Sequence, residues 1–459
     1  MAPKFGTSGL RGLVVELTSD LVADYLRAFL AACPVGSGLY VGRDLRPSSP
    51  ALADHVIAAA RGEGINVTDC GAVPTPALAL AAMQAGAGAV MVTGSHIPAD
   101  RNGLKFYLPH GEISKADEAA ILAALGRAPR CGDAALSNLS DCGDLWSARY
   151  VAAFGATALA KLKIGVWSHS AVSRDMVQTT LAALGAEVVE LGRSDTFIPV
   201  DTEAVPAWAR AQIAAWVAEH RLDALVSTDG DGDRPLVADA VGAIVPGDLL
   251  GQITARVVGA DTVVTPISSN TGVAAPGRFA RVVRTRIGSP FVIAAMTEAG
   301  GRVVGYEANG GFLLGFDATL PAGPLAALPT RDSLLPIAAP LSVAHAAGGL
   351  ASLVAAEPLR FTAADRLEDV ATERAAAFLQ ELISDAAYRA TLLNGLAEEE
   401  ASTDQTDGLR ISCSSGNIVH LRPSGNAPEF RGYVEAANRA DSEHLLARVL
   451  QSIRAHFDQ

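Results

Sequence analysis

The feature that most constrains the fold is a regular alternation of short apolar segments with longer Ala-rich segments over the first three quarters of the chain. The short segments have the length and composition of β-strands, and the longer ones have helical spacing. The expected strands are 39–41, 65–69, 87–92, 162–167, 187–191, 222–226, 262–265, 281–284 and 302–304, and the expected helices are 49–61, 75–84, 172–184, 207–219, 248–258 and 290–299. The alternation occurs three times and predicts layered α/β units with largely parallel sheets.

The last quarter of the chain lacks this alternation. A Pro- and Ala-rich passage at 321–340 precedes a long helical pattern at 365–393. Expected strands then follow at 409–413, 417–421 and 430–435, and a closing helix is expected at 441–456. Adjacent strands flanked by helices predict a smaller α+β domain. The expected domain ranges are 1–143, 144–244, 245–357 and 358–459.

Composition limits the classes of function. A formal net charge of −13 argues against broad nucleic-acid binding, so an anionic substrate would have to be met by localised Arg and Lys side chains and a metal. The five cysteines are odd in number and show no CxxC spacing, which favours a reduced, cytoplasmic protein. The N-terminus shows no apolar signal core, and no apolar run reaches membrane-spanning length. We therefore expect no membrane or nucleic-acid partner.

Three aspartates alternate with two glycines in the run Ser-Thr-Asp-Gly-Asp-Gly-Asp-Arg-Pro at 227–235, directly after an apolar segment. Carboxylates two residues apart in a tight turn can point at one centre, and glycine permits the close backbone approach. Without a cation they would repel by roughly 4 kcal/mol per pair at about 4 Å and an effective dielectric of about 20. Oxygen ligands favour Mg²⁺ or Ca²⁺. We expect Asp229, Asp231 and Asp233 to bind a divalent metal at the C-terminal end of a strand.

Other interpretations of the aspartate run can be compared with the sequence. An EF-hand starting at Asp229 would need Gly at its sixth position and Glu at its twelfth, where this chain has Arg234 and Ala240. A haloacid-dehalogenase-type phosphatase also places aspartates after a strand, but needs Thr or Val where Asp233 stands. A solvated acidic turn remains an alternative, because Asp and Gly are ordinary turn residues.

A second polar loop, 93–105, follows the expected strand that ends at residue 92. Ser95 is a candidate nucleophile or phosphate carrier, which would need activation by a base or by a metal on the transferring group. His96 and Lys105 are nearby cationic candidates. The Asn-Gly pair at 102–103 predicts a turn that returns Lys105 toward Ser95.

Two further loops carry groups suited to a sugar phosphate. Glu307 and Asn309 are two residues apart and flanked by glycines, so they can hydrogen-bond adjacent ring hydroxyls, although a capped turn is an equal alternative. In the loop 422–431, an arginine, a serine, an asparagine and exposed glycine amides together offer phosphate-binding chemistry.

These four loops, in this order and spacing, resemble the α-D-phosphohexomutase superfamily, as do Phe-Gly-Thr-Ser-Gly-Leu-Arg-Gly at 5–12 and Gly-Arg-Asp-Leu-Arg-Pro-Ser-Ser at 42–49. The resemblance implies three α/β domains of similar topology plus a smaller α+β C-terminal domain around a central cleft, one loop from each domain. It implies an isomerase that interconverts hexose 1-phosphate and hexose 6-phosphate through a phosphoserine enzyme. Mg²⁺ would be the metal, and hexose 1,6-bisphosphate the intermediate and activator. The expected activity is that of a phosphomannomutase, with phosphoglucosamine mutase or phosphoglucomutase as the alternative. The protein would act on small-molecule sugar phosphates as a monomer or weak dimer.

The resemblance also implies roles for individual residues. Ser95 would carry the phosphoryl group, and an oxygen of phosphorylated Ser95 would join the three aspartates as a metal ligand. Arg11, Lys105, Arg234 and Arg286 match cations of the cleft, and Lys105 or His96 would manage the proton of the sugar hydroxyl. Glu307 and Asn309 would read the sugar, while the non-reacting phosphate would be bound by Arg422, Ser424, Gly425, Asn426 and Arg431.

The chain departs from the superfamily pattern in two loops. The loop 93–105, the serine loop, usually contains Ala-Ser-His-Asn-Pro in the superfamily. This chain has Ile97 in place of the bracing Asn and Gly94 in place of the Ala. The loop 305–311, the sugar loop, often contains Glu-x-Ser-Gly-His in the superfamily. This chain has Gly311 in place of the histidine and its imidazole. Because of these two losses, a catalytically silent sugar-phosphate binding protein remains an alternative. The sequence does not determine the preferred hexose.

Overall fold

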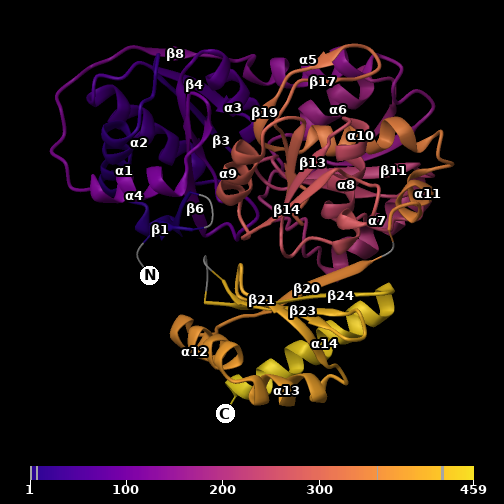
Figure 1. Cartoon of the computed structure of the whole chain (residues 1–459). Coiled ribbons are helices and arrows are strands. Elements are labelled where there is room, and N and C mark those ends of the chain that lie inside the picture. The colour runs from indigo at the N-terminus through magenta and orange to yellow at the C-terminus, as the bar shows by residue number, and fades with distance from the viewer. Residues whose placement is uncertain (1–2, 7–8, 359, 425–427, 459) are drawn as a thin grey trace.

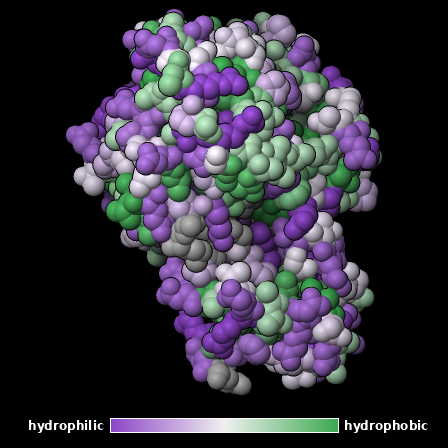
Figure 2. Space-filling model, turned by 90° about the vertical axis from the view of Figure 1, so that its left-hand side faces the viewer, coloured by the Kyte–Doolittle hydropathy of each residue, from purple (hydrophilic) through white to green (hydrophobic). Residues whose placement is uncertain are grey.

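A computed structural model of the chain describes residues 3–6, 9–358, 360–424 and 428–458. It contains three consecutive α/β units and a C-terminal unit with an antiparallel sheet (Figure 1). The C-terminal unit lies beneath the other three in this view, and Figure 2 shows a waist in the surface between them. Within these ranges, no helix is both long and apolar enough to cross a membrane.

The first sheet is covered by helices on both faces. In spatial order it contains β1 (Lys4–Phe5), β2 (Leu10–Leu13), β6 (Arg101–Leu108), β5 (Gly88–Val92), β3 (Leu39–Arg43), β4 (Val67–Ala72) and β8 (Leu136–Asn138), with β7 (Gly111–Glu112) beside β6. Its helices are α1 (Ser19–Ala32), α2 (Ser49–Gly62), α3 (Thr75–Gln84) and α4 (Lys115–Ala123). Alternate residues of β5 enter different cores, Val90 toward α1 and α2 and Met91 toward α3. Burial on both faces explains why β5 is apolar throughout.

The second and third units repeat one arrangement. The second sheet has the order β10 (Glu187–Leu191), β9 (Lys163–Trp167), β11 (Ala224–Thr228), β12 (Pro235–Ala238), and the third has β14 (Arg281–Thr285), β13 (Thr262–Pro266), β15 (Val303–Tyr306), β16 (Phe312–Leu314), β19 (Leu328–Asp332). Their helices are α6 (Arg174–Ala183), α7 (Ala207–His220), α8 (Gly247–Val257), α9 (Ser289–Ala299), α10 (Leu334–Ala344) and α11 (Leu350–Ala355). The short pair β17 (Ala318–Thr319) and β18 (Pro324–Leu325) lies apart from these sheets.

The repeat places three of the motif loops at equivalent positions. In each α/β unit at least three neighbouring strands are parallel and the next strand returns antiparallel: β6 after β5, β12 after β11, and β16 after β15. The serine loop, the aspartate loop and the sugar loop each connect the last parallel strand to this returning strand. Each loop therefore leaves the carboxyl end of a parallel strand, where open α/β sheets bind ligands. The sequence predicted the parallel strands but not the returning ones.

The C-terminal unit has its own core. Its sheet has the order β20 (Phe361–Leu367), β24 (Phe430–Ala436), β23 (Ile418–Pro423), β22 (Leu409–Cys413), β21 (Glu400–Asp404), and every pairing is antiparallel. Helices α12 (Thr372–Ser384), α13 (Ala386–Gly395) and α14 (Arg439–Phe457) complete it. Its buried apolar residues form a separate cluster, whereas one cluster runs through all three α/β units. The expected fold class, three α/β units plus a smaller α+β unit, is confirmed.

Some expected elements are wrong. The helical pattern at 365–393 contains the end of β20 and two helices, because Asp385 ends one helix and its carboxylate caps the next by accepting the backbone N–H groups of Ala387 and Tyr388. The Pro- and Ala-rich passage at 321–340, for which no element was predicted, contains β18, β19 and much of the buried helix α10. The loop 93–105 ends earlier than expected, because β6 begins at Arg101.

Candidate active site

The serine loop holds Ser95 in a strained backbone conformation. Ser95 has a φ of 54°, in the left-handed region that costs an L-residue roughly 1–2 kcal/mol. Its backbone N–H donates to Thr93 Oγ1 at 2.7 Å, and Thr93 Oγ1 donates to Asp44 Oδ2 at 2.6 Å. Side chains therefore fix the backbone that carries the serine, as is common where strain serves a site.

Arg46 braces this loop through most of its N–H donors. Its guanidinium donates to the carbonyl oxygens of Ser95 (2.8 Å), Ile97 (2.6 Å), Pro98 (2.7 Å) and Arg101 (2.9 Å). It also pairs with Asp44 at 3.2 Å and is 1% exposed. An arginine from the preceding motif thus braces the loop that has Ile97 where the superfamily pattern has Asn. The sequence placed Arg46 in a motif but gave it no role.

Gly94 provides the space that Arg46 needs. A Cβ at Gly94 would lie 2.5 Å from Cζ of Arg46, closer than atoms can approach. The opposite face of the guanidinium lies against the ring of Phe197, with Cζ 4.1 Å from the ring centroid. Because Phe197 follows β10, the second unit helps to fix a loop of the first.

Replacing Arg46 with Lys should lower kcat by about 10-fold or more. A lysine ammonium has three donors at one point and cannot span five acceptors, so Ser95 loses its fixed backbone. The measurement is the rate of the mutase reaction that the resemblance to the α-D-phosphohexomutase superfamily implies. Arg43→Lys is the matched control, since Arg43, at the end of β3, pairs with Asp69 on β4 at 3.9 Å. An unchanged kcat in Arg46→Lys would contradict the bracing role.

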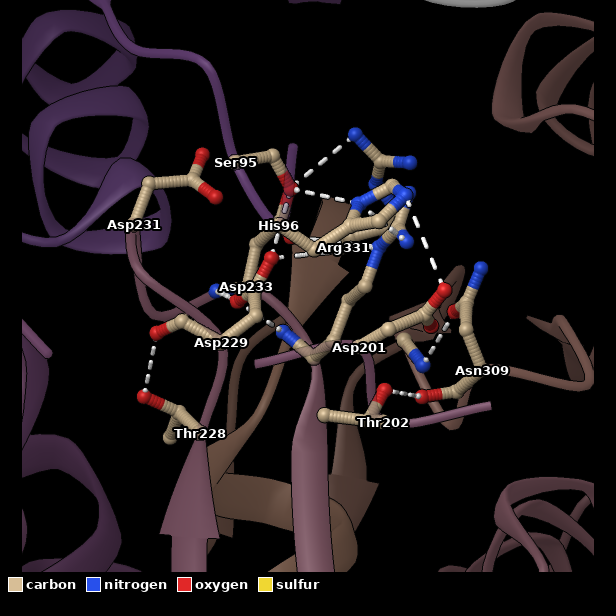
Figure 3. A network of polar contacts seen from close by, with 12 residues as sticks. Ser95, His96, Asp201, Thr202, Thr228, Asp229, Asp231, Asp233, Asn309 and Arg331 are labelled. Carbon is tan, nitrogen blue, oxygen red and sulfur yellow. Dashed lines mark hydrogen bonds and ion pairs between the residues drawn. The ribbon is translucent and has the colours of Figure 1, made fainter. Parts of the chain in front are cut away.

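The serine loop and the aspartate loop meet, although they belong to different units. Ser95 Oγ donates to Asp229 Oδ2 at 2.6 Å, and its hydroxyl lies 3.4 Å from Nδ1 of His96 (Figure 3). The loops also touch through their backbones, because a Cβ at Gly230 would lie 2.8 Å from the carbonyl oxygen of Ser95. The structure therefore places a hydroxyl and an acidic cluster face to face.

The aspartate loop gathers its carboxylates around one centre. Ligand oxygens of Asp229, Asp231 and Asp233 lie within 4.8 Å of one another, and all three side chains are buried. The turn is closed by Asp229 Oδ1, which accepts the backbone N–H groups of Asp233 and Arg234 at 3.2 Å each. Gly232 has a φ of 76°, which lets the backbone turn between the second and third aspartates. The burial of all three aspartate side chains excludes a solvated acidic turn.

Cations partly neutralise this cluster. Lys105 Nζ lies 2.5 Å from Asp231 Oδ2 and 2.6 Å from Asp233 Oδ2, and Thr75 Oγ1 donates to Asp231 at 2.5 Å. Burial raises the pKa of Asp229, and the two neighbouring carboxylates raise it further. Burial acts in the same direction on Asp231, but Lys105 outweighs it and holds the pKa of that carboxyl below its usual range.

Two carboxylate oxygens in the cluster accept no hydrogen bond from the described residues. Oδ1 of Asp231 and Oδ1 of Asp233 are buried and have no hydrogen-bond partner in the described part of the chain. A buried carboxylate oxygen without a partner is costly, and a cation removes that cost. The donor set of three carboxylates is what hard divalent ions prefer. The residues present therefore fit a divalent metal.

The surroundings of His96 favour its neutral form over the cationic form that the sequence suggested. Burial, together with the nearby Arg234 guanidinium, lowers the pKa of His96 to about 3. Arg234 Nη1 donates to Nδ1 of His96 at 2.9 Å, so Nε2 carries the ring proton. Nε2 lies 4.0 Å from Asp201 Oδ2, on the segment that leads to α7.

Arg11 and Lys105 reach the site from neighbouring strands. Arg11, on β2, donates to the carbonyl oxygen of Thr93, and burial lowers its pKa to about 10. Lys105 lies within β6, and the Asn-Gly pair at 102–103 is part of that strand, so the expected turn is wrong. Gly103 is required there because a Cβ would lie 2.0 Å from the carbonyl oxygen of Leu10 on β2. Lys105 contacts the aspartates, and among the described residues no hydrogen bond joins it to Ser95.

The sugar loop is a closed turn that faces the acidic cluster. The backbone N–H of Glu307 donates to the carbonyl oxygen of Gly311 at 3.2 Å, and the N–H of Gly311 donates to Asn309 Oδ1 at 3.0 Å. Thr202 Oγ1 donates to the carbonyl oxygen of Asn309 at 2.8 Å (Figure 3). The Glu307 side chain contacts Arg331, which also contacts the aspartate loop. Arg331 was missed because it lies in the Pro- and Ala-rich passage, without a motif of its own.

The predicted phosphate-binding residues lie in the C-terminal unit. Gly425 and Asn426 fall outside the described residues. Arg422 pairs with Asp407 at 3.4 Å, Arg431 pairs with Glu429 at 3.0 Å, and the backbone N–H of Ser424 donates to the carbonyl oxygen of Glu429 at 2.8 Å. This unit approaches the serine loop through Asp201, which lies 3.9 Å from Nη1 of Arg366 on β20.

Arg286 is not brought to the cluster of Ser95 and the aspartates. It is exposed on the third unit, and its guanidinium stacks over Phe291 with Cζ 5.1 Å from the ring centroid. Its expected place in the cleft therefore stays a prediction.

Family models cover most of the chain. The models of phosphoglucomutase/phosphomannomutase α/β/α domains I, II and III match residues 2–129, 148–242 and 238–361. The solved structure of a putative phosphomannomutase from Thermus thermophilus is similar with a TM-score of 0.75 and 22% identity, covering 100% of both chains. At that identity the likeness shows the fold alone.

Curated relatives are similar over nearly their whole length. A phosphomannomutase from Sinorhizobium fredii is 47% identical over 469 residues, covering 98% of each chain. A phosphomannomutase from Salmonella muenchen is 40% identical over 459 residues, covering 98% of this chain and 95% of that one. A phosphoglucosamine mutase from Sphingopyxis alaskensis is 29% identical over 474 residues, covering 98% and 99%. The chain belongs to the phosphoglucomutase/phosphomannomutase family of the α-D-phosphohexomutase superfamily.

Proposed function

We propose that the protein is a phosphohexomutase, an isomerase that interconverts hexose 1-phosphate and hexose 6-phosphate, and that mannose phosphate is its substrate. The observation that carries this proposal is the 2.6 Å hydrogen bond from Ser95 to Asp229. It joins a hydroxyl that can carry a phosphoryl group to a carboxylate cluster that can hold a metal. Phosphoryl transfer needs both parts, because its catalysis consists mostly of positioning and charge stabilisation.

Mg²⁺ is the metal that we propose for the aspartate loop. Asp229, Asp231 and Asp233 would hold it, together with an oxygen of phosphorylated Ser95. Support comes from the buried Oδ1 atoms of Asp231 and Asp233, which accept no hydrogen bond in the described part of the chain. When bound, Mg²⁺ would offset the negative charge that develops on the transferring phosphoryl group.

In the proposed reaction, the phosphoryl group moves from Ser95 Oγ to the free hydroxyl of the hexose phosphate. The P–O bond to Ser95 breaks while the P–O bond to the sugar forms, and the product is hexose 1,6-bisphosphate. The proton of the sugar hydroxyl would end on Ser95 Oγ, the leaving oxygen, with Lys105 as the first candidate for managing its transfer and His96 as the second. The bisphosphate turns around and returns its other phosphoryl group to Ser95, so added bisphosphate acts as an activator.

Arg11 and Arg234 would stabilise the transferring group beside Ser95. Glu307 and Asn309 would hydrogen-bond the ring hydroxyls in both orientations of the sugar. The non-reacting phosphate would bind the C-terminal unit through Arg422, Ser424, Gly425, Asn426 and Arg431, with Arg286 as a further cation. The 3.9 Å approach of Arg366 to Asp201 supports closure of this unit over the ligand. We keep the four domain ranges given above, and a cytoplasmic monomer or weak dimer, as parts of the proposal.

The preferred substrate is tested by kcat/KM for mannose 1-phosphate, glucose 1-phosphate and glucosamine 1-phosphate, each with bisphosphate activator. We expect mannose 1-phosphate to be the best substrate, because the relatives at 47% and 40% identity are named phosphomannomutase. A higher value for glucosamine 1-phosphate would favour the phosphoglucosamine mutase alternative. Tight binding without isomerisation of any of the three would instead support a silent sugar-phosphate binding protein. Membership of the mutase family removes the haloacid-dehalogenase alternative.

A further inference from the structure

The end of β19 brings an arginine into the site that none of the sequence motifs contains. Arg331 is 3% exposed, and its Nη2 lies 2.9 Å from Asp233 Oδ2 (Figure 3). Its Nη1 lies 3.4 Å from Glu307 Oε2. One guanidinium therefore links a carboxylate of the aspartate loop to the carboxylate of the sugar loop, across the boundary between the second and third units.

The side chain of Arg331 fills the space beside Gly311. A Cβ at Gly311 would lie 2.9 Å from Cδ and 3.1 Å from Cγ of Arg331. Gly311 does not have a positive φ, so its backbone conformation does not demand glycine. The absent side chain instead makes room for Arg331. The position where the sugar loop lacks an imidazole is thus occupied by a cation from a neighbouring strand.

Neighbouring contacts fix the backbone that carries Arg331. Asp332 accepts the indole N–H of Trp146 at 3.0 Å and the hydroxyl of Tyr150, both from α5 (Cys142–Phe154). Ser333 Oγ donates to the carbonyl oxygen of Gly232, within the aspartate loop, at 2.7 Å. Arg331 is therefore held in register with the aspartate loop by the residues that follow it.

The guanidinium is not saturated by protein groups. Nε of Arg331 is buried and has no hydrogen-bond partner among the described residues. Buried donors are nearly always paired, so an unpaired one beside a proposed sugar site points to a ligand oxygen. Only the two terminal nitrogens are used, one for each carboxylate.

We propose that Arg331 is a positioning residue that determines hexose selectivity, because it orients Glu307 toward the ring hydroxyls from the space left by Gly311. This inference rests on the proposed mutase function. A guanidinium suits the task, because its planar fork can hold two carboxylates in fixed directions at once. An ammonium is a point charge and would hold Asp233 without fixing the direction of Glu307.

Arg331→Lys and Arg331→Ala test the proposal with mannose 1-phosphate and glucose 1-phosphate. In both variants we expect KM for mannose 1-phosphate to rise about 10-fold or more, the scale of one lost hydrogen bond to a charged group. We expect kcat to fall less, and the ratio of kcat/KM between the two sugars to move toward one. Arg331→Lys should keep the melting temperature and the Mg²⁺ affinity, which separates positioning from folding.

A wild-type ratio between the two sugars in the well-folded Arg331→Lys variant would overturn the inference. Arg302→Ala is the matched control, since Arg302 belongs to the same unit and is outside the site. Its guanidinium stacks over Phe316 with Cζ 4.6 Å from the ring centroid, and its Nε donates to the carbonyl oxygen of Gly259. We expect this variant to keep both the KM and the sugar preference.

The Gly311→Ala variant tests the contact between residue 311 and the side chain of Arg331. The new Cβ would press on the stem of Arg331, and it would also lie 3.1 Å from Asn309 Oδ1. If the new methyl group acts through Arg331, the Gly311→Ala variant loses hexose selectivity. In an Arg331→Ala background the same change then has no further effect on selectivity. Fully additive effects would show that Gly311 acts through Asn309 and would overturn this part of the inference.

The two proposals fail in different ways. A wild-type protein that isomerises none of the hexose phosphates refutes the proposed function. Calorimetric binding of mannose 1-phosphate to wild type and to Arg331→Lys still tests the inference in that case. Equal affinities, with equal preference over glucose 1-phosphate, would overturn it.

Discussion

The Ser95→Ala variant is expected to lose mutase turnover by about 10⁴-fold or more, even with hexose 1,6-bisphosphate present. Alanine has no oxygen that can carry the phosphoryl group, so the proposed cycle cannot start. The substitution keeps the Cβ and hence the same backbone strain at a φ of 54°. The main structural loss is the hydrogen bond to Asp229, so the fold should persist.

Three measurements decide the role of Ser95. Steady-state assays give the mutase rate, circular dichroism confirms the fold, and mass spectrometry locates phosphate in the wild-type protein. Phosphate on Ser95 and on no aspartate is the expected pattern. Ser37→Ala is the matched control, because the exposed Ser37 hydroxyl donates only to the carbonyl oxygen of Ala85. A normal rate in Ser95→Ala would remove the carrier role.

The second large effect is expected for Asp231→Asn, which should weaken Mg²⁺ binding by about 100-fold and lower the mutase rate with it. The variant keeps the shape of the side chain but removes one of three converging negative charges. The amide also places an N–H₂ group in a cluster where Oδ1 of Asp231 has no donor partner in the described structure. An N–H₂ group cannot coordinate a cation.

Metal titration separates this effect from a loss of folding. Calorimetry with Mg²⁺ alone gives the affinity without substrate, and activity against Mg²⁺ concentration gives the functional dependence. Asp223→Asn is the matched control at the other end of β11, where Asp223 accepts the backbone N–H of Lys163 at 2.7 Å. If Asp231→Asn kept the wild-type Mg²⁺ dependence, the aspartate loop would have no part in the mechanism.

The α/β units could be predicted from the sequence because parallel strands that are buried on both faces consist of consecutive apolar residues. Helix α3 and strand β10 have the predicted bounds. The returning strand β6 was not predicted, since the polar pair at its start and Lys105 within it resemble a loop. Asn102 is satisfied by the hydroxyls of Ser48 and Ser49 and Lys105 by the aspartate loop, partners that local patterns do not contain.

The residues of the aspartate loop and the serine could be identified locally, because their chemistry depends on spacing within a few residues. Arg46 and Arg331 could not be assigned roles in this way. Arg46 acts on a loop about fifty residues further along the chain, and Arg331 on carboxylates 24 and 98 residues earlier. Such pairs are decided by tertiary packing, since no local spacing relates them.

The sequence by itself determined the unit pattern, the cluster of carboxylates in the aspartate run and the family, because each is expressed in short-range order of residue types. Only the tertiary structure decided that Ser95 meets Asp229, that burial lowers the pKa of His96, and that Arg46 and Arg331 lie beside Ile97 and Gly311. The physical reason is that charge, burial and close packing depend on neighbours in space, and these neighbours are far apart in the sequence.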